Sequence, residues 1–324
     1  MSQSQDDIKL AEKLVATAEA IKQQLARVIV GQEDVVEQML WTLFSQGHCL
    51  LVGVPGLAKT LLVRSLAEVL DMQFQRIQFT PDLMPMDILG VELTGDHSEL
   101  VIKRGPIFAN IILADEINRT PPKTQAAMLE AMQERQVTFA GERQPLPQPF
   151  FVLATQNPIE QEGTYPLPEA QLDRFMLSIP IGYPTHEQEC QLVLRTTQEE
   201  PPTLEKVTDA EELIELIGLS RRVPVSETVV TKAVELVRRT RPNDAIAPGM
   251  VRRNVRWGAG PRASQYLILA AKTRALLSGK FAADWEDVQQ VAVSVLRHRI
   301  VTTFAATAEG ITSDAIVEEI LLKN

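Results

Sequence analysis

The stretch of the chain that decides the fold reads Gly53-Val54-Pro55-Gly56-Leu57-Ala58-Lys59-Thr60. It follows an apolar run at 49–52, which suits a buried parallel strand. It precedes residues 61–70, whose apolar side chains recur with helical periodicity. A strand, a tight glycine-bearing loop and a helix form the context in which this pattern binds phosphate groups. The alternative is a plain turn between strand and helix.

Each part of this loop has a chemical reason. Gly53 and Gly56 let the backbone curl so that successive N–H groups point at an anion, and the helix N-terminus adds its own donors. Lys59 is placed to reach the outer phosphates, and the Thr60 hydroxyl to bind Mg²⁺. We therefore predict an ATP site to which the following residues contribute: Gly53, Val54, Pro55, Gly56, Leu57, Ala58, Lys59, Thr60 and Leu61.

The loop departs from the usual pattern at Ala58, because glycine normally precedes the lysine. Alanine is small, and it is tolerable there if the residue already has the backbone angles of the following helix. We therefore expect residue 58 to be helical.

A second motif follows another fully apolar strand, which we expect at 110–114. The strand ends on Asp115-Glu116. Asp115 is placed to hold Mg²⁺, and Glu116 to orient and polarise the water that attacks the terminal phosphate. Successive side chains of a strand point to opposite faces, so both can serve only if Glu116 lies past the strand end. The alternative is an acidic strand end that caps a turn.

Two other segments allow two interpretations. Asn157 follows the apolar strand expected at 150–155, so its amide could touch the terminal phosphate, or it could form an Asn-Pro turn. The segment Val30-Gly31-Gln32 interrupts two helical patterns, and the residues alone favour a connecting turn over a contact with a purine base.

The order of the patterns predicts an α/β fold with a parallel, helix-covered sheet over roughly residues 34–182. Two inserted β-hairpins are expected at about 91–103, across Gly95-Asp96-His97, and at about 136–143. After residue 184 strand patterns disappear, which predicts an all-helical second domain with a loop at 240–256. We expect three parts: an N-terminal helix at 1–28, an α/β core at 29–184 and a helical lid at 185–324.

Composition narrows the function. The chain has 324 residues and a formal net charge of −10, which argues against non-specific nucleic-acid binding as the main activity. Cys49 and Cys190 form neither a disulfide framework nor a metal motif. The N-terminus lacks a signal pattern, and no apolar run approaches the ~20 residues that span a bilayer. We expect a cytoplasmic protein.

The sequence resembles the MoxR family of AAA+ ATPases. Besides the phosphate-binding loop, the resemblance rests on 114–125, beginning Ala-Asp-Glu-Ile-Asn-Arg, on 129–134 and on 154–158. It continues through 163–175 and through the Gly-Ala-Gly-Pro-Arg-Ala block at 258–263. These blocks occur in order from about residue 28 to the C-terminus, which is more specific than any single motif.

The resemblance implies roles for residues that the patterns alone leave open. Asn157 matches the residue that senses the terminal phosphate, and Arg174 matches the arginine finger, which acts on the nucleotide of a neighbouring subunit. Arg262, at the start of a lid helix, matches the second sensor. Val30-Gly31-Gln32 matches the segment before the adenine pocket, which favours the base contact.

The resemblance also implies a ring, usually hexameric, with the hairpins near its pore. Such ATPases remodel or mature protein complexes, including metal-cofactor insertion, with a partner that carries a von Willebrand factor A domain. Two other functions are considered. A nucleic-acid-dependent motor would need a basic pore, against which the acidic composition argues. A slow nucleotide-gated adaptor would not need Glu116 and Arg174 together.

Overall fold

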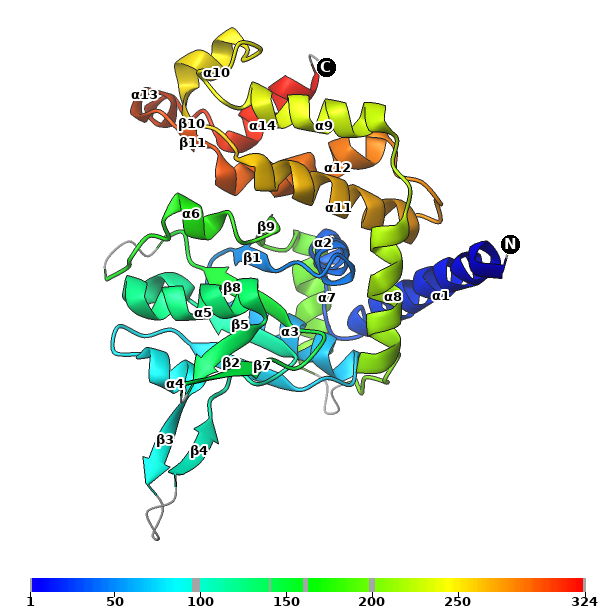
Figure 1. The fold of residues 1–324 in the computed structure, drawn as a ribbon, viewed down its shortest axis with the longest axis vertical. Coiled ribbons are helices and arrows are strands. Elements are labelled where there is room, and N and C mark those ends of the chain that lie inside the picture. Colours follow the sequence, from blue (N-terminus) through cyan, green and yellow to red (C-terminus); the bar gives the residue numbers. More distant parts are fainter. Residues whose placement is uncertain (1, 95–99, 140, 160–162, 198–201, 323–324) are drawn as a thin grey trace.

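Five parallel strands form the central sheet, in the order β2-β5-β8-β1-β9 (Figure 1). The structure, a computed structural model, describes residues 2–94, 100–139, 141–159, 163–197 and 202–322. The strands are β1 (Cys49–Val52), β2 (Phe74–Gln78), β5 (Ile111–Asp115), β8 (Phe151–Gln156) and β9 (Leu177–Pro180). Because β8 pairs with both β1 and β5, the three chain segments that leave their carboxyl ends lie side by side.

Helices cover both faces of this sheet, as the alternating patterns predicted. On β1, Leu51 packs into one buried cluster, whereas Leu50 packs into another, because strand side chains alternate between faces. The first cluster includes residues of α1 (Ser2–Leu25), α2 (Glu33–Phe44) and α3 (Lys59–Val69). The second includes residues of α4 (Pro85–Leu89) and α5 (Pro122–Glu134). The α/β core is confirmed.

Two antiparallel hairpins are inserted in the core, as predicted. The first pairs β3 (Gly90–Thr94) with β4 (Leu100–Arg104), and it projects away from the helical lid (Figure 1). Its expected turn at Gly95-Asp96-His97 lies outside the described residues. The second pairs β6 (Gln136–Phe139) with β7 (Glu142–Pro145).

The proline-bounded segment at 81–87 runs into the short helix α4. Pro85 takes the first helical position, where its missing N–H costs nothing. The Asp87 carboxylate accepts a 2.8 Å hydrogen bond from the Met84 N–H and so closes the start of the helix.

The second half of the chain is helical, as predicted. Its longer helices are α7 (His186–Thr196), α8 (Ala210–Arg222), α9 (Glu227–Arg239), α11 (Pro261–Leu277), α12 (Trp285–Leu296) and α14 (Ser313–Leu322). Shorter ones are α6 (Glu169–Leu172), α10 (Gly249–Asn254), α13 (Phe304–Ala308) and the 3₁₀ turn η2 (Arg297–Arg299), while a second 3₁₀ turn, η1 (Ile117–Arg119), follows β5 in the core. Side chains of Asp209, Ser226 and Asp284 accept hydrogen bonds from the first turns of α8, α9 and α12, which explains where these helices begin.

The lid differs from the expectation in one respect. Part of the expected loop at 240–256 forms α10, and β10 (Val255–Trp257) pairs antiparallel with β11 (Val301–Thr302). The two strands are too short and too far apart in sequence to give a strand pattern. The lid is therefore helical with one small two-stranded sheet.

Packing between the parts is extensive. Helix α11 packs against α1, α2 and α8, and α12 packs against β9. Helix α1 contacts both α3 in the core and α11 in the lid. The division at residues 28 and 184 stays a prediction, since the N-terminal helix joins both parts. None of the described helices combines the length and hydrophobicity that a membrane-spanning helix needs.

Candidate active site

The phosphate-binding loop connects β1 to α3 at the carboxyl edge of the sheet. At Gly53 a Cβ atom would lie only 2.6 Å from the Ile181 carbonyl oxygen, so only glycine fits beside the end of β9. Gly56 has a φ of +85°, which a side chain would strain. Both glycines are thus required for the loop to curl as it does.

Ala58 does not have the helical conformation that we expected. It precedes α3 with φ of 54° and ψ of 21°, which is the left-handed region. A Cβ atom in this region costs roughly 1–2 kcal/mol, which explains why glycine is usual at this position. The alanine is tolerated with strain and not because residue 58 has joined the helix.

Lys59 folds back over its own loop. Its ammonium group donates to the carbonyl oxygens of Gly53 at 2.5 Å and of Val54 at 3.2 Å. Burial lowers the pKa of Lys59, while the nearby carboxylates of Asp115 and Glu116 act in the opposite direction. The lysine therefore sits where a phosphate oxygen would take over as its partner.

Asp115 ends β5, and two neighbours engage its carboxylate. Its Oδ1 accepts a 2.6 Å bond from the Thr155 hydroxyl on β8. Its Oδ2 accepts bonds from the Arg76 guanidinium on β2, at 3.0 Å from Nε and 2.6 Å from the terminal nitrogen. Residues from the strands on both sides thus fix the carboxylate.

Glu116 lies just past the strand end, with a φ of 57°. This left-handed residue is sterically strained, and such strain is common at functional sites. Its Oε2 accepts bonds from Gln78 Nε2 at 3.0 Å and from the Arg119 guanidinium at 2.9 Å. Because Glu116 lies beyond the strand, it lines the same cavity as Asp115, which meets the condition set by the sequence.

That cavity has a volume of about 380 Å³. Its described lining residues are Pro55, Gly56, Leu57, Ala58, Lys59, Thr60, Arg76, Asp115, Glu116, Thr155 and Asn157. The side-chain Oδ1 of Asn157 accepts a 3.1 Å bond from the Ile159 N–H, so Asn157 does form a local turn. The amide nitrogen is the group that Asn157 can offer to a ligand.

A second cavity, of about 260 Å³, adjoins the first through Pro55–Ala58. It is lined by Val30, Gly31 and Gln32 together with Leu61 and apolar residues such as Tyr183 and Leu192. Gln32 Nε2 donates a 3.0 Å bond to the Leu57 carbonyl, whereas its buried Oε1 has no partner among the described residues. The structure therefore brings the segment at 30–32 to the phosphate-binding loop.

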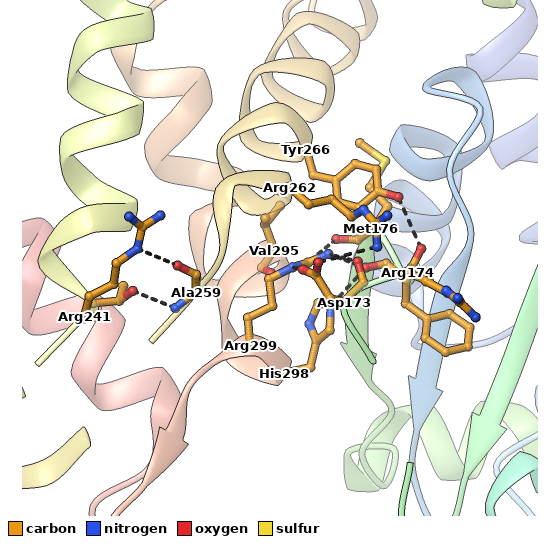
Figure 2. A network of polar contacts seen from close by, with 12 residues as sticks. Asp173, Arg174, Met176, Arg241, Ala259, Arg262, Tyr266, Val295, His298 and Arg299 are labelled. Atoms are coloured by element: carbon orange, nitrogen blue, oxygen red, sulfur yellow. Dashed lines mark hydrogen bonds and ion pairs between the residues drawn. The ribbon is translucent and has the colours of Figure 1, made fainter. Parts of the chain in front are cut away.

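Arg174 and Arg262 lie elsewhere. Neither is among the described residues that line these two cavities. Arg262 is 3.5 Å from the Asp173 carboxylate, and Figure 2 shows the Arg174 side chain pointing away from that cluster. No described residue forms a hydrogen bond or an ion pair with the Arg174 guanidinium.

Comparisons with known proteins agree with this geometry. Residues 48–177 match the ATPase family associated with various cellular activities (AAA), and residues 249–320 match the AAA lid domain. The chain is 43% identical to chaperone MoxR1 of Mycobacterium tuberculosis, over 96% of this chain and 83% of that protein. This chain belongs to the MoxR family of AAA ATPases. It is also 30% identical to protein MoxR of Methylorubrum extorquens, over 87% of each chain.

A solved structure resembles the whole fold of this MoxR-family ATPase. The crystal structure comes from Cytophaga hutchinsonii, with a TM-score of 0.93 and 39% sequence identity. It covers 100% of this chain and 99% of that chain. The resemblance to the MoxR family, the enzyme class and nucleotide binding are thereby confirmed.

Sequence reasoning missed four residues around the carboxylates of this MoxR protein: Arg76, Gln78, Arg119 and Thr155. Arg76 and Gln78 alternate with buried positions on β2, so they look like ordinary solvent-facing residues of an edge strand. Only the pairing of β2 with β5 reveals their role. A prediction that β2 lies next to β5 would have identified Arg76 and Gln78.

The residues of this MoxR protein fit a magnesium ion. Mg²⁺ binds oxygen ligands, usually one or two carboxylates together with phosphate oxygens of a substrate. The Thr60 hydroxyl and the Asp115 carboxylate line the same cavity. The described residues form no cluster of three acidic, histidine or cysteine side chains that would hold a metal without a substrate.

Proposed function

We propose that this ATPase hydrolyses ATP at the interface between two copies in a ring, and that the ring is a hexamer. The observation that carries the proposal is the position of Arg174. Its guanidinium lies outside its own nucleotide cavity and has no described partner. An arginine so placed has the charge to stabilise a neighbour's transition state.

Different residues of the cavity hold the phosphates, the metal ion and the attacking water in this proposal. Lys59 and the loop N–H groups hold the phosphates, while Thr60 and Asp115 hold Mg²⁺, which neutralises charge on the phosphates. Glu116 orients the attacking water, and Asn157 positions the terminal phosphate. Gln78 and Arg119 both donate to Glu116 Oε2, so Oε1 is the oxygen that accepts from the attacking water in this proposal.

Arg262 belongs to the same outward face as Arg174 in this proposal. The sequence resemblance suggested a sensor that couples phosphate state to the lid. Its side chain lies 3.5 Å from Asp173, the residue next to Arg174, and it does not line the two described nucleotide cavities. We propose that Arg262 assists Arg174 at the neighbour's nucleotide.

The biological task we propose is the remodelling or maturation of protein complexes. The relative named chaperone MoxR1 supports this task. The hairpins carry mixed charge, with Lys103 and Arg104 on one and adjacent Glu142 and Arg143 on the other. Such surfaces suit a protein client better than a nucleic acid, whose phosphates require clustered cations.

The proposal also covers the partner protein and the cellular location. We propose that the ring works with a partner bearing a von Willebrand factor A domain and that its tasks include the insertion of a metal cofactor. We also propose action in the cytoplasm, because both cysteines are unpaired thiols, Cys49 buried and Cys190 exposed. Co-purification with tagged Glu116→Gln protein held in its ATP-bound form tests the partner.

A mixing experiment tests the shared site. Glu116→Gln protein lacks the catalytic carboxylate but keeps a normal finger, whereas Arg174→Ala protein has the reverse defect. Each alone is expected to lose ATP turnover, and an equal mixture is expected to regain a substantial fraction. A mixture as inactive as its components would overturn the proposal that the site is shared.

A further inference from the structure

The short segment that carries Arg174 is fastened to the lid at every backbone carbonyl. The carbonyl oxygens of residues 173, 174, 175 and 176 each accept a hydrogen bond from a lid side chain. The donors come from α11 and η2, which are distant in sequence from this segment and from each other (Figure 2). Four consecutive carbonyls held in this way define one position for the turn.

Arg299 makes most of these contacts. Its terminal nitrogens donate to the carbonyls of Asp173 at 3.0 Å, Phe175 at 2.6 Å and Met176 at 3.2 Å. Its Nε donates to Asp173 Oδ1 at 2.8 Å, and the fifth N–H binds the Val295 carbonyl within the lid. All five donors of this buried guanidinium are therefore used.

Two other lid residues complete the arrangement. The Tyr266 hydroxyl donates to the Arg174 carbonyl at 3.2 Å, and its ring lies 5.1 Å from the Arg299 guanidinium. His298 lies 3.0 Å from the Phe175 carbonyl through Nε2. Burial keeps the pKa of His298 well below its usual value, so the ring is neutral and Nε2 carries the proton.

We propose that Arg299, assisted by Tyr266 and His298, is a positioning residue that fixes the Arg174 finger to the lid. This inference rests on the proposed function of Arg174 in a neighbour's site. Rotation of the lid against the core would then move the finger directly. The contrast between a fully held backbone and a guanidinium with no described partner is what such a device requires.

If Arg299 only held the lid and core together, its hydrogen bonds would not need to converge on one turn. Elsewhere the lid meets the core mainly through apolar packing, such as α11 on α2 and α12 on β9, with single side-chain hydrogen bonds such as Ser45–Thr273 and Ser294–Gln38. Here one arginine instead directs four of its five donors to the turn at 173–176. The polar contacts are thus concentrated on the segment whose side chain must be aimed.

The test uses full-length protein with Arg299→Lys and the milder Tyr266→Phe. We expect ATP affinity to change less than twofold, because neither residue lines the nucleotide cavities. The kcat should fall about tenfold or more for Arg299→Lys, but not beyond the ~10³-fold loss of a missing finger. Tyr266→Phe, which removes one hydrogen bond, should lower kcat about threefold.

Arg297→Lys provides the matched control. Arg297 lies in the same 3₁₀ turn and is also largely buried, but it pairs with Asp314 inside the lid at 2.9 Å. Its substitution should leave kcat unchanged. Equal losses in kcat for Arg297→Lys and Arg299→Lys would overturn the inference, because the effect would then reflect lid stability.

Mixing separates positioning from general damage. Arg299→Lys protein mixed with Glu116→Gln protein should regain turnover, because the second supplies an intact finger to the first. Mixed with Arg174→Ala protein it should regain none. The mixture of Arg174→Ala with Glu116→Gln serves as the reference. If the reference mixture regains turnover but the mixture of Arg299→Lys with Glu116→Gln does not, the role of Arg299 is overturned and the shared site stands. If the reference mixture also fails, the shared site itself is overturned.

Discussion

The carboxylates of the nucleotide cavity and the arginine at position 174 are held in opposite ways. Asp115 and Glu116 have their side chains bound by Arg76, Gln78 and Arg119. Arg174 has its backbone bound by the lid, while no described residue binds its guanidinium. One region keeps its reactive groups engaged within the chain, and the other presents its reactive group outward.

This difference indicates which parts of the reaction a single chain completes. The cavity gathers the residues to which we assign phosphate binding, metal binding and water orientation, and they follow β1, β5 and β8 of one copy. In the proposed mechanism, the cation that balances the transition-state charge comes from another copy. Substitutions in the nucleotide cavity and nearby can show how far its function and stability depend on the contacts that hold it.

The largest effect is expected from Glu116→Gln. The substitution keeps the shape of the side chain but removes the base, so turnover should fall roughly 10²–10⁴-fold while ATP affinity stays the same. Steady-state hydrolysis and equilibrium binding of a labelled nucleotide measure the two quantities. Glu130→Gln, on an exposed position of α5, is the control. Near-normal turnover of the Glu116 variant would remove this residue from the mechanism.

Stability should fall in acid through His48, a buried residue just before β1. Its Nδ1 accepts a 3.0 Å bond from the Val152 N–H, and burial lowers its pKa to about 4. The folded pKa is below the unfolded value, so His48 contributes full stability above about pH 6.5 and loses it toward pH 4. The loss should reach about 2 kcal/mol by pH 4.5.

The comparison that isolates this histidine uses His48→Gln. Denaturant unfolding at several pH values gives the free energy of unfolding of both proteins. The advantage of the wild type over the variant should shrink as the pH falls from 7.5 to 4.5. A constant difference would show that the protonation of His48 is not linked to folding.

A smaller effect is expected from Arg76→Gln. The Arg76 guanidinium binds Asp115 Oδ2, so in the proposed mechanism it competes with Mg²⁺ for this carboxylate. Its removal should lower the Mg²⁺ concentration for half-maximal hydrolysis about threefold, an energy typical of one hydrogen bond. Arg64→Gln makes the same charge change at an exposed position of α3. A higher Mg²⁺ requirement would instead identify Arg76 as a support for the metal site.

The smallest effect is expected from Ala58→Gly. Glycine relieves the left-handed strain at φ of 54° but adds freedom to the unfolded chain, so a net stabilisation of about 0.5 kcal/mol should remain. Ala67→Gly, in the middle of α3, should instead destabilise the protein by about 1 kcal/mol. Urea unfolding measures both, and an equal loss in the two variants would contradict the strain at Ala58.

Patterns local to the sequence predicted much of the fold. The strand, loop and helix around Lys59, the apolar strand before Asp115 and both hairpins follow from hydrophobic spacing and turn residues. The lid helices were also predicted, because their apolar periodicity is clear. The small sheet of β10 and β11 was not, since strands of two or three residues leave no pattern.

The sequence by itself determined which groups this protein has for nucleotide chemistry, because a phosphate-binding loop and a strand-end carboxylate are made from neighbouring residues. The tertiary structure alone decided how those groups are restrained and where Arg174 is directed. Strand order brought Arg76 to Asp115, and the lid brought Arg299 to residue 173, across 39 and 126 positions of sequence. Contacts at such separations depend on packing of the whole chain, which no local pattern records.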